Sequence, residues 1–348
     1  YYHFKTFWDV KDDDVFWCTS DIGWVVGHSY IVYAPLVAGA TTVFREGAID
    51  HPDPGVFYET IEKYGVNVMF TAPTLLRMLM RYGEEYPKKH DLTSLRFLTC
   101  AGEPLNPEAL KWTYEFICGN GEWGHIVDNW WQTETGGPCL GTPATIPVRP
   151  GRVGVAMPGA ELDIVDREGV PITEPDKGGL LVIKKPFPHF YRTVFGDPER
   201  QAKDWNTIPG VYLTGDVALR DADGYYMVVG RADDVLNVAG HRIGSAEVES
   251  ALVSNAAVAE AAVIGIPDKL RGEVIKAFVT LRMGQDPSEE IVAALKLHVR
   301  EELGPIAVPA EIDFMPVLPK TRSGKIMRRL LKANELGLDP GDITTLEE

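Results

Sequence analysis

The chain has 348 residues, of which 45% are hydrophobic and 24% charged, as is typical of a globular protein with two or three domains. Its formal net charge of −16 argues against a general nucleic-acid surface and against an anionic-membrane surface. The four cysteines contain no Cys-x-x-Cys pair, which argues against zinc ribbons and disulfide frameworks and favours a reducing cytoplasm. The sequence shows no signal-peptide pattern and no apolar run long enough to cross a bilayer.

From residue 15 to about residue 129, short apolar runs alternate with amphipathic segments. The expected strands are 15–18, 41–44, 66–70, 96–100 and 125–128. The expected helices are 29–38, 54–64, 73–82 and 107–118. Prolines stand at three of the helix starts, and Thr71 and Asn106 are the expected capping residues. This alternation predicts a parallel sheet with helices on its faces.

From residue 150 to about residue 230, glycine and proline interrupt the chain every few residues. The expected strands, at 161–165, 179–183 and 225–229, are short, and residues 221–224 form a turn before the last of them. This pattern predicts a small antiparallel barrel or sandwich.

A third part follows residue 233. Ser245 is expected to cap a helix that ends at Ser254 and buries Val248, Ala251 and Leu252. Strands are expected at 259–266, 274–281 and 311–315, with a helix between the last two that stops at Gly304. The predicted fold class is therefore α/β plus α+β, with an α/β part (1–149), a β-barrel-like part (150–232) and a C-terminal α+β domain (233–348).

The segment 128–137 combines two acids, two amides, two tryptophans, two threonines and two glycines directly after an expected strand. An open α/β sheet binds its ligand where such loops follow its strands, and glycine lets a backbone approach a ligand closely. A buried tryptophan pair capped by turn residues is the structural alternative.

Two other segments follow expected strands. The loop 101–107 contains a glycine that would let backbone amides approach a flat or anionic ligand, although the segment taken alone favours an ordinary strand–helix loop. Because parallel strands present their C-terminal ends together, we expect 101–107 and 128–137 to line one crevice. The segment 212–216 places Asp216 after a glycine turn, where its carboxylate could accept two ribose hydroxyls. A turn aspartate bonded to its own backbone is the alternative.

Three segments of the last part have unusual residues. The pair Asp233-Asp234 lies where the composition changes, and suits either a hinge or a static linker. Arg242 lies between two glycines, which suits phosphate binding or a β-hairpin. Five cations fall in the eleven residues 319–329, and the Thr, Ser and Gly near Lys325 indicate a flexible loop that could bring this lysine to a reacting phosphate. A basic surface loop is the alternative.

These segments, in this order, resemble the adenylate-forming superfamily of acyl-CoA synthetases, adenylation domains and luciferases along essentially the whole chain. The run Trp-Trp-Gln-Thr-Glu-Thr-Gly, with segments 23–30 and 236–242, is similar to AMP-forming acetyl-CoA synthetases. The resemblance implies that a carboxylate attacks the α-phosphate of Mg-ATP to give acyl-AMP and pyrophosphate. The small domain then rotates, and the thiol of coenzyme A attacks the acyl carbonyl. ATP, Mg²⁺, coenzyme A and acetate are the implied ligands.

The same resemblance implies residue roles. Adenine would be held by Gly102, Glu103, Pro104, Asp128, Asn129, Trp130, Trp131 and Gln132. Thr133 would contact phosphate, Glu134 would bind Mg²⁺, Asp216 would bind ribose with Arg231 nearby, and Arg242 would bind phosphate. Asp233 would be the hinge, Lys325 would act in adenylation, and Gly240 and Arg300 would contact coenzyme A. Acylation of Lys325 would remove its charge, so a lysine acetyltransferase and a deacylase are expected partners.

The resemblance also places an acyl pocket between Val25, Val26, Ala101 and Trp131. The indole of Trp131 would leave room for a methyl or ethyl group and exclude longer chains by overlap. Because one methylene changes binding by only ~1–3 kcal/mol, the distinction between acetate and propionate should be soft. The small side chain of Ala101 favours some tolerance of propionate.

The sequence departs from the family in two ways. The glycine-rich phosphate loop and the larger N-terminal portion are missing, so we expect the C-terminal part of a longer chain, folded at least in part but poorly active alone. Asn255 stands where the family often has a histidine, which argues against a second metal site there. The alternatives are a propionyl-CoA or other short-chain acyl-CoA synthetase, an adenylation domain that loads a carrier protein, and a non-catalytic binding module.

Overall fold

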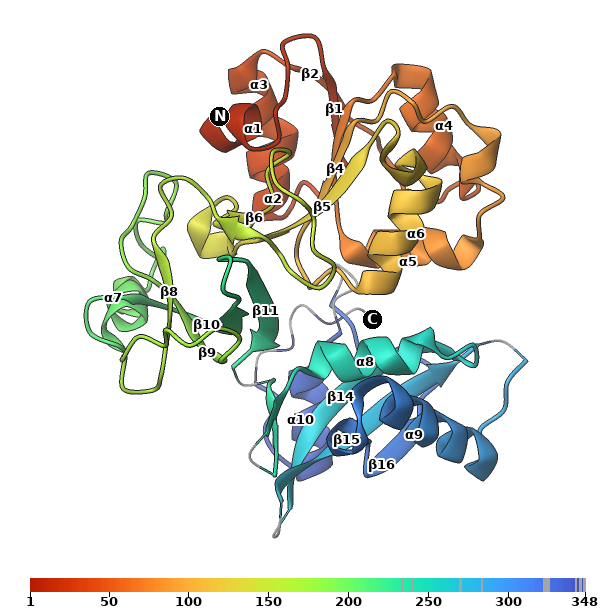
Figure 1. Ribbon diagram of the computed structural model, residues 1–348, viewed down its shortest axis with the longest axis vertical. Helices are drawn as coiled ribbons and strands as arrows, with labels where there is room; N and C mark the ends of the chain where they lie inside the picture. The colour runs from red at the N-terminus through yellow and green to blue at the C-terminus, as the bar shows by residue number, and fades with distance from the viewer. Residues whose placement is uncertain are drawn as a thin grey trace. The chain divides into compact units, whose positions relative to one another are not determined.

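The computed structural model describes residues 1–232, 234–239, 241–268, 271–282, 284–321, 326–341, 343 and 346 (Figure 1). The chain divides into two compact units. The first contains Tyr1–Thr214 and Leu219–Val228, and the second contains Gly215–Ala218 and Val229–Glu348. None of the described helices is both long and apolar enough to cross a membrane.

The first unit is built on a seven-stranded sheet with the order β2-β1-β3-β4-β5-β6-β7. Its strands are β1 (Val15–Cys18), β2 (Thr41–Val43), β3 (Val68–Thr71), β4 (Phe97–Cys100), β5 (His125–Trp130), β6 (Leu140–Gly141) and β7 (Val155–Ala156). The first five strands pair in parallel, whereas β6 and β7 join antiparallel. The predicted parallel sheet is confirmed, and its strands lie within three residues of the expected bounds.

Helices cover both faces of this sheet (Figure 1). One face carries α4 (Gly55–Tyr64), α5 (Pro73–Tyr82) and α6 (Pro107–Phe116). The other carries α1 (Tyr2–Thr6), α2 (Val25–Gly27), a π-helical stretch (His28–Tyr33) and α3 (Ala34–Ala38). Successive strand residues alternate between the two cores, as Phe16 and Trp17 do in β1. The helix expected at 29–38 is therefore present, with a π-helical first part.

The expected helix caps are correct at one position and wrong at two. The side chain of Asn106 accepts a hydrogen bond from the Ala109 amide at the start of α6. Thr71 does not cap α5, because it ends β3 and its hydroxyl bonds instead to the hydroxyl of Thr19 at 2.8 Å. Ser245 is the first residue of α8 (Ser245–Ser254) and follows Gly244 at the N-cap, which has no side chain to accept a bond.

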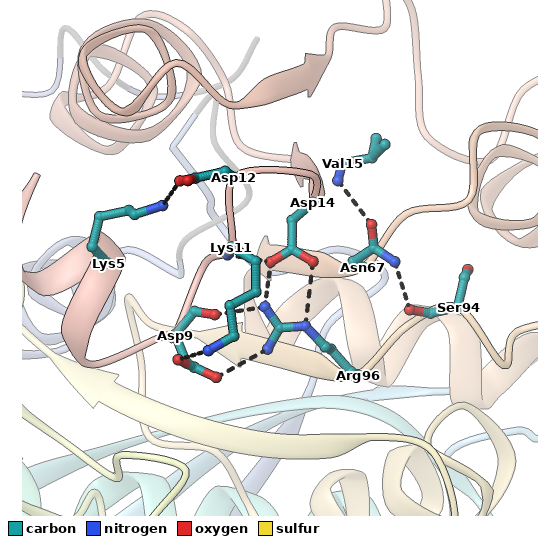
Figure 2. Close-up of polar contacts among 9 residues, drawn as sticks. All are labelled: Lys5, Asp9, Lys11, Asp12, Asp14, Val15, Asn67, Ser94 and Arg96. Atoms are coloured by element: carbon teal, nitrogen blue, oxygen red, sulfur yellow. Dashed lines mark hydrogen bonds and ion pairs between the residues drawn. The ribbon is translucent and has the colours of Figure 1, made fainter.

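Polar side chains fix the register at the starts of the strands (Figure 2). Asn67 accepts from the Val15 amide at 2.8 Å and donates to the Ser94 carbonyl at 3.2 Å. Arg96 bonds to the Asp14 carboxylate and donates to the Asp9 carbonyl at 2.6 Å, so the segment before β1 is held against the start of β4. These contacts align β1, β3 and β4.

The antiparallel subdomain is confirmed as a four-stranded sheet with the order β11-β10-β9-β8. Its strands are β8 (Leu162–Val165), β9 (Gly179–Ile183), β10 (Tyr212–Arg220) and β11 (Tyr226–Arg231). The helix α7 (Pro198–Asn206), capped by Asp197, was not expected from the sequence. The glycine turn expected before Asp216 is wrong, because β10 continues through Gly215, whose φ is +74°.

The second unit contains a sheet in which β15 (Gly272–Leu281) pairs with β14 (Val258–Asp268), with β12 (Leu236–Val238) and with β16 (Glu311–Phe314). The expected strands and the stop at Gly304 are confirmed. α8 and α9 (Glu289–Leu303) cover one face, and their core contains Val248, Ala251 and Leu252 as predicted. α10 (Arg328–Leu336) packs on β14 through a second cluster that joins Leu331 to Ile264. β12 and β13 (His241–Ile243) form the hairpin that was one of the two interpretations of this segment.

Candidate functional site

The loops that follow β4 and β5 lie side by side, as expected from the parallel sheet. Cys100 and Asp128 are register partners at the ends of these strands. The Asp128 carboxylate accepts from the Leu105 amide at 3.2 Å and from the Asn129 amide at 2.9 Å, so it joins the loop after β4 to β5. Burial raises the pKa of Asp128 to about 7, although these two hydrogen bonds oppose the rise.

The Gly102-Glu103-Pro104 turn is supported from α5. Gly102 has φ +109°, which favours glycine, and is exposed. The Glu103 carboxylate pairs with Arg77 at 2.9 Å and bonds to the hydroxyl of Thr74. Arg77 and Thr74 were not anticipated, since nothing in the spacing of α5 indicates a partner 26 to 29 residues away.

The side chain of Asn129 forms its hydrogen bonds inside the first unit. Its amide donates to Thr99 and to the Cys100 carbonyl, and its oxygen accepts from the Trp8 indole at 3.5 Å. The residue is only 3% exposed. A ligand in this region would therefore contact the main chain of Asn129, whereas the amide orders the strand end that carries the loop.

Trp131 lies in an apolar cluster together with two of the other residues assigned to the acyl pocket. Its indole meets the rings of Tyr30 and Phe70 edge-on, with centroid distances of 5.7 and 6.3 Å. Ala101 and Val26 belong to the same cluster. Val25 precedes Val26 in α2 and is half-buried. Val26 lies 75 residues before Ala101 in the chain, so these two side chains share the cluster only because of the fold.

Gln132 connects this loop to β10. Its amide donates to the Thr214 carbonyl at 2.8 Å, and its oxygen accepts from the Tyr212 hydroxyl at 3.2 Å. Thr214 lies two residues before Asp216 in the same strand. The link was not anticipated, because 82 residues separate the two partners.

Residues Thr133–Thr135 form one 3₁₀ turn, which Gln132 and Thr135 close through a reciprocal capping box. The following Gly136 has φ +65°, and a Cβ there would lie 2.6 Å from the His189 carbonyl oxygen. Ser29 donates to the Gly136 carbonyl at 2.7 Å. Only glycine therefore fits at position 136, whereas a Cβ at Gly137 would lie 3.4 Å from its nearest neighbour.

Glu134 carries the expected metal-binding carboxylate. It pairs with Arg200 of α7 at 3.4 Å, and its main-chain carbonyl accepts from the Tyr191 amide at 2.8 Å. The described residues contain no group of three or more His, Cys, Asp or Glu side chains that could hold a metal ion. A single carboxylate fits Mg²⁺ when nucleotide phosphates supply further oxygens, which is how Mg²⁺ is commonly bound.

Asp216 and Arg231 come together on neighbouring strands. Asp216 is 6% exposed, and its carboxylate lies 3.9 Å from the Arg231 guanidinium. The Arg231 guanidinium also covers Gly215, where a Cβ would lie 2.5 Å from Nη2. A buried acid beside a half-exposed arginine can accept hydroxyl donors while the arginine meets an anion.

For four of the assigned residues, the structure does not describe the side chain. Asp233, Gly240 and Lys325 lie outside the described residues, and of Arg242 only the backbone, in β13, is described. Arg300 lines a surface cavity of about 460 Å³ with Arg271 and Lys296. Asn255 follows α8, and its side chain accepts from the Ala257 amide at 3.0 Å.

The sequence matches two family models. Residues 1–190 match the model described as AMP-binding enzyme. The chain belongs to this family. Residues 247–325 match the model described as AMP-binding enzyme C-terminal domain, which corresponds to the second unit.

This AMP-binding enzyme is similar to several acetyl-coenzyme A synthetases. It is 53% identical to the one from Pyrobaculum aerophilum over 348 residues, which cover 99% of this chain and 52% of the relative. The identity to the one from Methanothrix soehngenii is also 53%, over 97% of this chain and 51% of the relative. The chain therefore spans about half the length of the curated relatives it matches.

Solved structures share the fold. The anthranilate CoA ligase AuaEII, in complex with anthranoyl-AMP, superposes with a TM-score of 0.81 at 28% identity, over 95% of this chain and 61% of that one. An acyl-CoA synthetase from Brucella canis gives a TM-score of 0.61 at 36% identity, over 96% of this chain and 60% of that one. The α/β, antiparallel and C-terminal parts are thus those of acyl-CoA ligases.

Proposed function

We propose that the full-length protein joins acetate to coenzyme A with ATP, through an acetyl-adenylate, and releases AMP and pyrophosphate. The observation that carries the proposal is the Trp131 cluster, in which Trp131 packs with Ala101 and Val26 directly before Gln132, whose amide donates to the Thr214 carbonyl. Identity of 53% to acetyl-coenzyme A synthetases over nearly the whole chain supports acetate as the acid.

Each group has a separate role in this proposal. The turn at Gly102–Pro104 and the main chain of 128–132 hold adenine, while Asp216 accepts the ribose hydroxyls beside Arg231. The Glu134 carboxylate would break its ion pair with Arg200 and bind Mg²⁺ instead. The metal ion neutralises phosphate charge when it is bound with the nucleotide. Thr133 and Arg242 contact phosphate. The apolar wall at Trp131 excludes water from the site, and this strengthens the electrostatic interactions there.

Lys325 stabilises the charge of the adenylation step, and Gly240 and Arg300 serve coenzyme A after a rotation about Asp233. The domain limits 1–149, 150–232 and 233–348 belong to this proposal. Acetylation of Lys325 would remove its charge and switch off adenylation. The described cysteines are free and buried, which supports a cytoplasmic location.

The decisive experiment uses the full-length protein, including the sequence before Tyr1. AMP release should require both acetate and coenzyme A, and kcat/KM should rank acetate above propionate and both above butyrate. Butyrate as the best substrate would contradict the role of Trp131. AMP release that free coenzyme A does not accelerate would indicate an adenylation domain that loads a carrier protein.

One observation favours some activity with propionate. Ala101 is 5% exposed and contributes only a methyl group to the cluster that contains Trp131. A methyl wall takes up less space than a larger side chain would, and a difference of one methylene is worth ~1–3 kcal/mol. We therefore expect propionate to be a measurable second substrate, and a preference of no more than about two-hundredfold would fit this reasoning.

A further inference from the structure

Two parallel aromatic rings contact the indole of Trp131. Tyr30 and Phe70 stack on each other with an interplanar angle of 7° and a centroid distance of 5.4 Å. The indole meets both rings nearly at right angles, at 79° and 84°. Among the ring contacts of the described residues, these are the two that Trp131 makes. Edge-to-face pairs at such distances are a favourable arrangement for aromatic side chains.

The two rings are themselves fixed in the first unit. Phe70 belongs to β3, Tyr30 lies in the π-helical stretch, and both are buried. The buried Trp8 contacts both rings, with centroid distances of 4.5 and 5.3 Å. Next to Tyr30, the Ser29 hydroxyl donates to the Gly136 carbonyl at 2.7 Å, which ties the π-helical stretch to the loop after β5. The rings therefore form a fixed support within this core.

A tryptophan side chain does not by itself fix the plane of its ring. The torsion that turns an aromatic ring about its Cβ–Cγ bond is broad, unlike the staggered torsions of aliphatic chains. Trp131 is only half-buried, so part of its surface is not packed. A longer acyl chain that presses on the indole would be opposed by the two buried rings that contact it. Exclusion by overlap requires a wall that keeps its place.

We propose that Tyr30 and Phe70 are positioning residues for acyl-chain selection, because they keep the Trp131 indole where it limits the length of the acid. This inference rests on the proposed function, in which Trp131 lines the acyl pocket. Neither ring is assigned to contact the substrate, so their loss should act through the indole. It should relax the preference for short acids rather than abolish the reaction.

The test measures the ratio of kcat/KM for butyrate to that for acetate in the full-length enzyme. Tyr30→Leu and Phe70→Leu each remove one edge-to-face contact with the indole. The ratio should rise about threefold to tenfold in each variant, which is the range that one aromatic pair is worth. Tyr30→Phe keeps the ring and removes only the hydroxyl, so its ratio should stay within about twofold of the wild-type value.

Phe16→Leu is the matched control for a loss of core packing. Phe16 is buried in the same cluster, and its ring contacts Phe4 and Trp8. Its replacement should lower the free energy of unfolding to a similar extent as the two test changes, without altering the ratio. An equal rise of the ratio in Phe16→Leu would show that a loosened core changes selectivity, and would overturn the inference.

A double variant separates positioning from a direct contact with the acid. If Tyr30 acts through the indole, Tyr30→Leu should change the ratio by less than about twofold once Trp131→Gly is present. Wild-type ratios in both Tyr30→Leu and Phe70→Leu, or full additivity in the double variant, would contradict the positioning role. Phe70→Leu decides the matter if Tyr30→Leu does not fold. A wild-type ratio in Trp131→Gly would instead refute the acyl pocket of the proposed function.

Discussion

The Gln132 amide donates to the Thr214 carbonyl at 2.8 Å, and this contact ties the polar loop after β5 to the strand that carries Asp216. This side chain therefore helps to fix the loop against β10. The Tyr212 hydroxyl bonds to the same glutamine, so both hydrogen-bonding groups of the amide are used on β10.

Gln132→Leu should weaken this link. It leaves a main-chain carbonyl and a tyrosine hydroxyl without their amide partner, so the free energy of unfolding should fall by about 1–2 kcal/mol. The KM for ATP should rise more than kcat falls. Gln132→Glu is a useful control, because it can still accept from Tyr212 but cannot donate to Thr214. Equal ATP kinetics in wild type and Gln132→Leu would contradict the proposed link.

Trp131→Gly should widen the acyl pocket. Removing the indole opens space next to Tyr30 and Phe70, so the ratio of kcat/KM for butyrate to that for acetate should rise about tenfold or more. Steady-state assays with acids of two to five carbons measure the change. Trp112→Gly removes a half-buried tryptophan from the core on the other sheet face and should lower stability without altering the ratio.

Gly215→Ala should displace Arg231. The backbone at Gly215 has φ +74°, so a side chain costs about 1 kcal/mol, and its Cβ would lie 2.5 Å from Arg231 Nη2. We expect a higher KM for ATP because the guanidinium moves away from Asp216. In a double-mutant cycle with Arg231→Ala, the two effects on KM should be far from additive. Simple additivity would show that the two residues act independently.

Asp128→Asn should change how stability depends on pH. Burial raises the folded pKa of Asp128 to about 7 from an ordinary value of 3.8. Between these values the folded state binds more protons than the unfolded state, so this carboxyl lowers stability as pH rises from about 4 to 7. The complete effect is on the order of 4 kcal/mol, because one pKa unit corresponds to about 1.4 kcal/mol. Urea unfolding at several pH values should show a flatter profile for the variant than for wild type. Identical profiles would mean that Asp128 is ionised in the folded protein at neutral pH.

Lys276→Met should strongly destabilise the second unit. Lys276 is 6% exposed and lies within 3.3 Å of the carboxylates of Glu311, Asp313 and Glu335. Its removal takes the shared cation from acids whose side chains are 29–56% exposed, so water screens part of the loss and the free energy of unfolding should fall by about 1–3 kcal/mol. Glu311→Gln is the control, since that side chain is 56% exposed and should matter little. Thermal unfolding of both variants distinguishes them, and equal melting temperatures would contradict the argument.

The amino-acid sequence determined most of the elements and their order, although not α7, β6 or β7. Apolar runs of four to six residues, prolines at helix starts and the change of composition near residue 150 gave the parallel sheet, the antiparallel part and the C-terminal α+β part. These signals are local, because hydrophobic periodicity and the residue preferences of turns extend over only a few residues. The motif loops after β4 and β5 were located for the same reason, and parallel pairing made them neighbours.

Only the tertiary structure decided which side chains meet. Gln132 and Thr214 are 82 residues apart, and Glu249 and Arg328, which form an ion pair, are 79 residues apart. Thr71 and Ser245 have side chains suited to capping, but the Thr71 hydroxyl bonds to the Thr19 hydroxyl instead. Ser245 is the first residue inside its helix, one position after the N-cap. A hydrogen bond forms where distance and direction permit it, and across long separations both are fixed by the packing of whole elements. Sequence patterns therefore specified the strands and loops, while their packing selected the contacts that would make a catalytic site.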